Sequence, residues 1–118
     1  MSRAATSVMV FAVYLFVLGL VFLLVPNTLL GLFRIPETHD VWVRLVGMLV
    51  ILIGFYYTVA ARNELVPILR ATVLARCSVM VFMAVFVGVG LAPPVMLVFG
   101  VVDVAAAAWT WLALRGAG

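Results

Sequence analysis

Four apolar stretches, each about 20 residues long, limit what this chain can fold into more than any other feature. A helix that crosses the hydrocarbon core of a bilayer, about 30 Å thick, needs roughly 20 apolar residues. The composition agrees, because 69% of the 118 residues are hydrophobic and 9% are charged, whereas soluble domains have about half and about a quarter. The sequence therefore predicts an all-α integral membrane protein, an antiparallel four-helix bundle in which residues 1–118 form a single transmembrane domain. The expected spans cover about 6–25, 41–61, 67–91 and 95–114.

Short connections separate these stretches, and they contain residues that end or begin helices. After the first stretch, "VPNTLLGLF" places Pro26 where a helix stops and adds a short apolar piece that we expect at the membrane interface. The polar segment "RIPETHD", residues 34–40, offers Thr38 or Asp40 as the cap of the second span. The first stretch is longer than the apolar region of a secretory signal and lacks an A-x-A cleavage site. We therefore expect it to remain as a span.

Charged residues gather near the ends of the four stretches. All seven basic residues are arginines. Because cytoplasmic connections carry an excess of arginine, their unequal division predicts that both termini lie in the cytoplasm. Arginines spread in this way form no basic patch with interleaved aromatic residues, which argues against a nucleic-acid partner. Five lie on the expected cytoplasmic side, Arg3, Arg62, Arg70, Arg76 and Arg115, and two on the other, Arg34 and Arg44.

A single acid lies within the fourth stretch, in "FGVVDVAAAAWTW", residues 99–111. At helical spacing, Gly100, Asp103, Ala107 and Thr110 share one face, a stripe of small and polar residues. Small residues let helix backbones approach closely in lipid, so we expect Gly100 and Ala107 to pack against another helix. A carboxylate that points into hydrocarbon costs several kcal/mol. Asp103 must therefore turn inward, pair with another group or be protonated.

The second stretch has a matching face of small and polar residues. Arg44, Gly47, Ile51, Gly54 and Thr58 lie along it, with the two glycines seven residues apart. Such a face is expected to be buried against a neighbouring helix. Close helix packing explains Gly47 and Gly54 better than contact with a ligand does.

Two arginines are candidate partners of Asp103. At about 1.5 Å of rise per residue, Asp103 lies roughly 14 Å below the outer end of its span, Arg44 about 5 Å and Arg76 about 24 Å. Depth in the membrane alone does not show which of the two arginines pairs with Asp103. We favour Arg44, because it shares a small-residue face, whereas Arg76 can extend to the cytoplasmic interface. Asp103 could instead accept a hydrogen bond from an aromatic donor, and the candidates are Tyr14, Tyr56, Tyr57 and Trp109.

Apart from Asp103, few residues are of types that form disulfides, bind metals or catalyse reactions. The one cysteine, Cys77, excludes an intrachain disulfide and a Cys-x-x-Cys site. The one histidine, His39, lies in a polar loop with too few ligands around it for a metal site, and it excludes paired-histidine haem ligation. We predict no metal and no catalytic residue. One interior acid with two arginines gives little for acid–base catalysis, so an enzyme is the least favoured class.

The sequence resembles the DoxX-like superfamily of small four-span bacterial membrane proteins. The resemblance rests on "RLVGMLVILIGFYY", residues 44–57, preceded by "VPNTLLGLF". Families in this group have an arginine that opens the second span, glycines at about +3 and +10, and a proline followed by an LF-type motif. Within the group, the length and "YYTVAARNE" are similar to the BphX-like type. The matching positions are Arg44, Gly47, Gly54, Pro26 and Phe33.

The resemblance implies a four-helix bundle, membrane partners and an interior cavity for a quinone or lipid-like molecule. It supplies no catalytic motif. We therefore expect a non-catalytic accessory subunit of a membrane complex, or a binder of a lipophilic ligand such as quinone or lipid. The expected partners are membrane lipids and other membrane subunits or further copies of the chain. The alternative is a small oligomeric transporter or channel that uses Asp103. Small multidrug exporters have similar length but carry a glutamate in span one, which this chain lacks.

Overall fold

The computed structural model describes residues 1–116, and within these residues every regular element is a helix. This confirms the all-α prediction. Four of the helices are long and apolar enough to cross a membrane. The short helix α2 coincides with the apolar piece expected after the first span. In chain order the elements are α1 (Arg3–Leu24), α2 (Pro26–Leu32), α3 (Val41–Arg62), α4 (Val66–Gly88), the 3-10 turn η1 (Pro94–Met96) and α5 (Leu97–Gly116).

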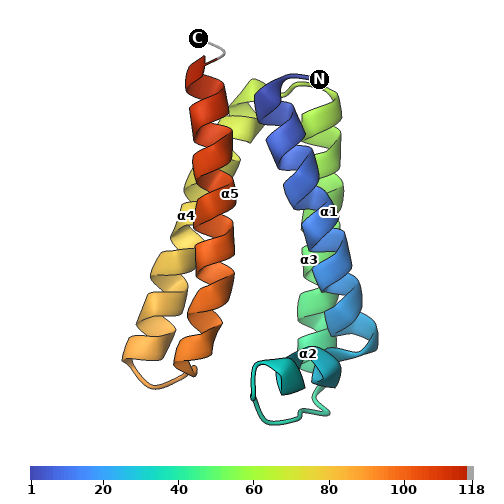
Figure 1. The fold of residues 1–118 in the computed structure, drawn as a ribbon. Helices are drawn as coiled ribbons and strands as arrows, with labels where there is room; N and C mark the ends of the chain where they lie inside the picture. Colours follow the sequence, from blue (N-terminus) through green and yellow to red (C-terminus); the bar gives the residue numbers. More distant parts are fainter. Residues whose placement is uncertain (117–118) are drawn as a thin grey trace.

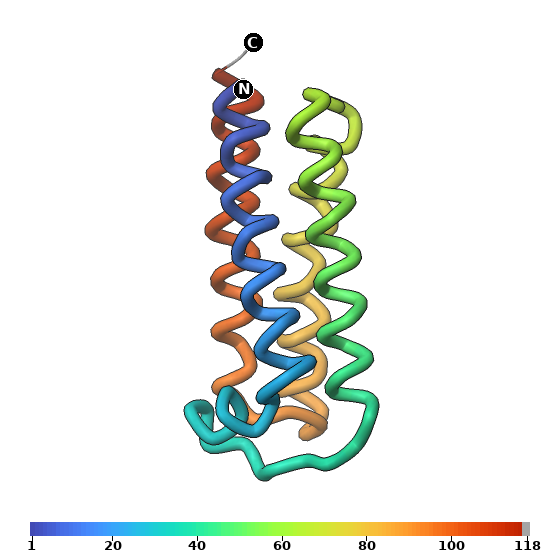
Figure 2. The backbone as a smooth tube through the Cα atoms, turned by 90° about the vertical axis from the view of Figure 1, so that its right-hand side faces the viewer, coloured from blue at the N-terminus to red at the C-terminus, as the bar shows by residue number. Residues whose placement is uncertain are grey.

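The long helices pack as two pairs, α1 with α3 and α4 with α5. Successive long helices run in opposite directions, and both termini lie at the same end of the molecule (Figure 1). The two pairs approach each other at that end and diverge toward α2 (Figure 1). The view turned by 90° shows the connection between α2 and α3 crossing beneath the helices (Figure 2). The arrangement is therefore two helix pairs joined mainly at one end.

Glycines hold α1 and α3 close together. A Cβ atom added to Gly47 would lie 2.6 Å from the carbonyl oxygen of Gly19 and 2.8 Å from the backbone nitrogen of Leu23. At Gly54 a Cβ would lie 3.3 Å from the Cβ of Leu15. The packing role predicted for Gly47 and Gly54 is thus confirmed. Gly19, which the sequence analysis did not single out, provides the opposing surface on α1.

The α4–α5 pair uses the predicted stripe of α5 in the same way. A Cβ on Gly100 would lie 3.0 Å from the Cα of Met80 on α4. Ala107 and Thr110 are fully buried. The small residues of this stripe therefore face protein, as the sequence indicates.

Three helices end with the same hydrogen-bonded turn, in which one residue adopts a left-handed backbone. For α4 this residue is Gly90, with φ of 82°. The N–H of Leu91 bonds to Phe86 and that of Gly90 to Val87, a Schellman motif. The motif ends α4 at Gly88, three residues before the predicted end of the third span at residue 91.

The corresponding residues after α2 and α3 are Arg34, with φ of 56°, and Glu64, with φ of 51°. Neither is a glycine, and a left-handed backbone is unfavourable for residues with a Cβ. At the start of α3, Asp40 is the capping residue but its side chain makes no capping hydrogen bond. The hydroxyl of Thr38 accepts from the N–H of Asp40. Of the two predicted caps, Asp40 therefore occupies the capping position and Thr38 does not.

Glu64 is tied to the beginning of the chain. The backbone N–H of Ser2 donates to its Oε1 at 2.6 Å, and the Ser2 hydroxyl donates to its Oε2 at 2.7 Å. These hydrogen bonds, the backbone one foremost, lower the pKa of the Glu64 carboxyl below its ordinary value. The contact joins the start of α1 to the α3–α4 connection.

This contact predicts a small dependence of stability on pH. Because the pKa of Glu64 is lower in the folded protein than in the unfolded chain, its contribution is complete above the unfolded pKa and disappears as pH falls through the folded pKa. Glu64→Gln should therefore flatten the acid side of the stability curve, measured by thermal unfolding in detergent. Glu37→Gln, in the loop at the opposite end, is the control. An unchanged acid side in Glu64→Gln would contradict the contact.

Candidate ligand-binding cavity

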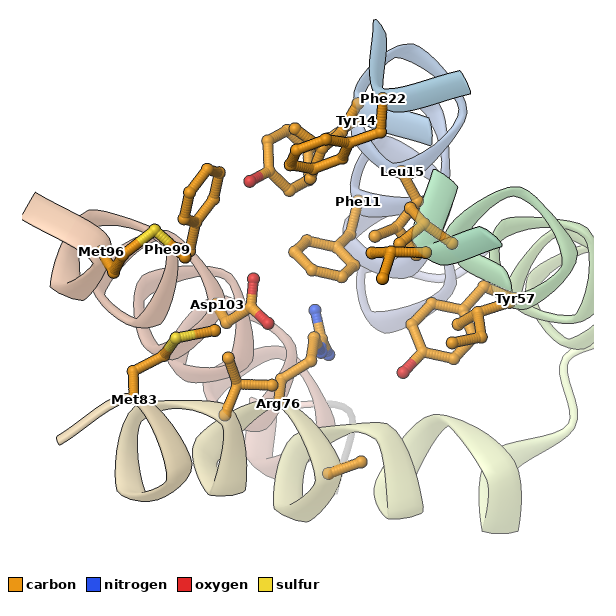
Figure 3. Close-up of a pocket in the computed structure, with 16 residues that line it drawn as sticks. Phe11, Tyr14, Leu15, Phe22, Tyr57, Arg76, Met83, Met96, Phe99 and Asp103 are labelled. Carbon is orange, nitrogen blue, oxygen red and sulfur yellow. The ribbon is translucent and has the colours of Figure 1, made fainter. Parts of the chain in front are cut away.

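A cavity of about 420 Å³ lies between the two helix pairs, and all four long helices contribute to its wall (Figure 3). Its volume is within the range of small-molecule sites, about 300–1,000 Å³. Most of the wall is aromatic or aliphatic, with four polar side chains among these residues. The lining residues are Phe11, Tyr14, Leu15, Leu18, Phe22, Val46, Val50, Ile53, Tyr57, Ala75, Arg76, Val79, Met83, Met96, Phe99 and Asp103.

Arg76 on α4 and Asp103 on α5 provide the charges of this cavity. Their guanidinium and carboxylate groups face one another (Figure 3). No arginine nitrogen in residues 1–116 lies within the 4.0 Å of an ion pair from a carboxylate oxygen. The two groups therefore face the same cavity without forming an ion pair.

Hydroxyl groups hold Arg76 inside the protein. Its Nε donates to the carbonyl oxygen of Thr72 at 3.1 Å, and its Nη2 donates to the hydroxyls of Thr72 at 3.0 Å and Thr110 at 2.8 Å. The Thr110 hydroxyl lies 2.6 Å from that of Ser7, which donates to the carbonyl of Ala4. This network crosses from α4 through α5 to α1. It fixes the guanidinium near the end at which the helix pairs meet.

One nitrogen of the buried Arg76 side chain differs from the other two in its hydrogen bonding. Only 2% of Arg76 is exposed, and its Nη1 has no hydrogen-bond partner among residues 1–116. The Phe11 ring lies 4.9 Å from the guanidinium carbon, a cation–π contact that satisfies no N–H. Buried polar groups in proteins nearly always have a partner. Arg76, which lines the cavity, thus keeps one hydrogen-bond donor that no described residue satisfies.

The structure corrects the preferred partner of Asp103. Arg44 donates from Nη1 to the carbonyl oxygen of Leu23, across the α1–α3 interface, and does not line the cavity. The face that Arg44 shares with Gly47 packs on α1 and not on α5. Arg76 does not extend to the interface, because Thr72 and Thr110 supply acceptors inside. Asp103 therefore faces Arg76, and the interpretation based on shared small-residue faces was wrong.

The structure places two of the proposed aromatic donors at the cavity and two away from it. Tyr14 lines the cavity as a candidate should, whereas Tyr56 is 68% exposed on the outside of α3. The adjacent Tyr57 lies on the cavity wall in its place. Trp109 is largely exposed. Of the four proposed aromatic donors, Tyr14 and Tyr57 are the two that reach the cavity.

The residues that hold Arg76 were only partly recognised from the sequence. Thr110 belonged to the predicted stripe, but Ser7 and Thr72 were missed. A signal existed for Thr72, because a hydroxyl four residues before an arginine lies on the same helix face. Ser7 carried no comparable signal, since its partner lies 103 residues away in the chain.

Comparison with known proteins adds no relative. No family model, no curated protein and no solved structure matches this chain. Among residues 1–116, no group of three or more side chains of the metal-binding types is placed to hold a metal ion.

Proposed function

We propose that this chain is a non-catalytic membrane protein that binds a lipophilic ligand in the cavity between its helix pairs. The observation that carries the proposal is a largely apolar cavity lined by both Arg76 and Asp103, in which the buried Arg76 keeps its Nη1 without a partner among residues 1–116. Small-molecule sites commonly combine an apolar wall with a few converging polar groups. The ligand's polar group would lie between Arg76 and Asp103, and its apolar part would lie against Phe11, Leu18 and the cavity's other hydrophobic residues.

The proposal includes insertion in a membrane. The four long helices would span a bacterial inner membrane as an antiparallel bundle, with both termini in the cytoplasm. Arg3, Arg62 and Arg115 support this orientation, because they lie at the ends of α1, α3 and α5 where the termini meet (Figure 1). Membership of the DoxX-like superfamily, and of a larger complex as accessory subunit, belongs to the same proposal.

The chemistry of Arg76 and Asp103 limits which classes of ligand can bind between them. Arg76 Nη1 is a donor, and the Asp103 carboxylate is an acceptor when ionised. A hydroxyl on the ligand can accept from the first and donate to the second at once. A quinol, a phenol or a lipid with a free hydroxyl satisfies both groups, whereas a quinone carbonyl satisfies Arg76 alone. A fatty-acid anion would place its charge against that of Asp103.

The alternative function, transport of ions by an oligomer through Asp103, fits the cavity less well. Its wall is largely aromatic and aliphatic along all four helices, with Phe22, Met96 and Phe99 toward the α2 end. An ion passing there would lose its hydration and gain few polar ligands in its place. The apolar wall therefore favours a lipophilic molecule.

The test uses 4-ethylphenol as probe and the methionine methyl groups as reporters. Met83 and Met96 line the cavity, whereas Met48 is 42% exposed on the outside of α3. In protein labelled with ¹³C at the methionine methyls, titration with the probe should shift the Met83 and Met96 resonances and leave Met48 in place. Asp103→Leu should weaken binding about tenfold or more, because a hydrogen bond to a charged group contributes about 1.5–3 kcal/mol.

Asp40→Leu, which removes an exposed acid before α3, is the matched control and should bind the probe as the wild type does. Equal shifts at Met48 and Met83 would show that the probe only dissolves around the protein. Absence of any shift at Met83 would also contradict the proposed site.

A further inference from the structure

A second cavity, of about 240 Å³, adjoins the first at the end where the helix pairs diverge. Leu29 and Leu30 of α2 form one side, and Ala92 and Pro93 of the α4–α5 connection form the other. All the residues that line it are apolar. It therefore has no polar side chain of its own to orient a polar ligand.

Three side chains, Phe22, Met96 and Phe99, line both cavities. The ring of Phe99 lies 6.4 Å from that of Phe22 and 5.3 Å, edge-on, from that of Phe33. Phe99 thus connects α5 with α1 and with the end of α2. The partition between the cavities consists of side chains, and rotation of an aromatic ring and of a flexible methionine can open it without movement of a helix.

The hydrogen bonds between the helix pairs lie at the opposite end. There the network of Arg76, Thr110 and Ser7 joins α4 and α5 to α1. At the α2 end, the aromatic contacts of Phe99 cross the same gap. The molecule is therefore fixed at its polar end, while the end with the second cavity is closed by packing that is easier to displace.

We infer that the two cavities are compartments of one site for an amphiphile with a neutral hydroxylated head and an unbranched apolar tail. The inference rests on the proposed function, because it places the head between Arg76 and Asp103. The tail passes Phe22 and Phe99 and fills the space between α2 and the α4–α5 connection. Continuity of the two walls through three shared residues supports one occupant for both.

Two probes with the same head and different tails test this inference. 4-Ethylphenol, with a two-carbon tail, is expected to occupy the first cavity alone, and 4-decylphenol carries a ten-carbon tail that is expected to extend into the second. Ala92→Trp places a large side chain in the second cavity, and Ala84→Trp, on the exposed side of α4, is the matched control. Affinities are measured from the methionine methyl resonances, each variant against the wild type in the same detergent. The probe then partitions into micelles equally for each variant and the wild type, so the ratio of their affinities is unaffected.

We expect Ala92→Trp to weaken binding of 4-decylphenol tenfold or more and to leave 4-ethylphenol within twofold of the wild type. Ala84→Trp should change neither. If Ala92→Trp does not fold, Leu30→Trp fills the same cavity from α2 and should give the same selectivity. Equal losses for both probes, or no loss for either, would overturn the two-compartment site while 4-ethylphenol still binds the wild type. Failure of both probes to bind the wild type would instead overturn the proposed function.

Discussion

Gly47→Ala is expected to destabilise the protein by about 3 kcal/mol, the upper part of the usual range for overpacking a well-packed interface. The added Cβ would lie 2.6 Å from the carbonyl oxygen of Gly19 and 2.8 Å from the backbone nitrogen of Leu23. Both are backbone atoms, so no side chain can rotate away. Relief requires α1 and α3 to separate, which weakens the packing along their whole contact. Unfolding of the purified protein in mixed micelles measures the loss.

Gly31→Ala is the matched control, because nothing lies within 4 Å of a Cβ added at that glycine of α2. There the only effect expected is the better helix propensity of alanine, a gain of up to about 1 kcal/mol. If the two variants had the same stability, the close approach of α1 and α3 would be wrong. Increased stability of Gly47→Ala would lead to the same conclusion.

The small-residue faces show what periodicity can and cannot predict. The spacing of Gly47 and Gly54 identified a buried face of α3, because residues separated by whole turns share a side of a helix. The spacing did not say which helix covers that face. It is α1, so Arg44 bonds to Leu23 and not to Asp103. Choice of neighbour depends on contacts between residues far apart in the chain, and a single sequence does not report them.

The helix ends show a second limit of prediction from the sequence. Gly90 carries the sequence signal of a helix end, and the structure uses it. Arg34 and Glu64 adopt the same left-handed backbone without being glycines. Glu64 is supported by its hydrogen bonds to Ser2, which is distant in sequence. Local residue preferences cannot predict a conformation that a distant contact stabilises.

Only part of the cavity could be predicted from the sequence. Asp103 on a face of small residues predicted a polar interior, and Tyr14, one of the proposed donors, lines the same cavity. Tyr56 and Tyr57 differ by about 100° around their helix, so the rotation of α3 about its axis decides which of them faces the cavity. The buried place of Arg76 depends on hydroxyls from Thr72 and Thr110. Without those acceptors, an arginine near a span end is expected to extend toward water.

The second large effect is expected for Arg76→Met, which should cost about 3 kcal/mol or more in the same unfolding measurement. Methionine fills much of the space of the arginine, so loss of packing contributes little. The cost arises because Asp103 loses its opposing cation and must then either carry an unpaired charge in an apolar cavity or take up a proton. Arg70→Met, on the exposed surface of the same helix, is the control and should stay within about 0.5 kcal/mol of the wild type.

The double variant Arg76→Met with Asp103→Leu separates a structural role of these residues from a binding role. Replacing both members of a buried charged pair with apolar residues is often neutral or stabilising. The double variant should therefore regain most of the stability lost in Arg76→Met, and it should no longer bind 4-ethylphenol. If it stays as unstable as Arg76→Met, the hydrogen bonds of Arg76 to Thr72 and Thr110 hold the helix pairs together, and stability explains the arginine without a ligand. Recovered stability with lost binding would mean that the fold does not require the two charges, and that the ligand does.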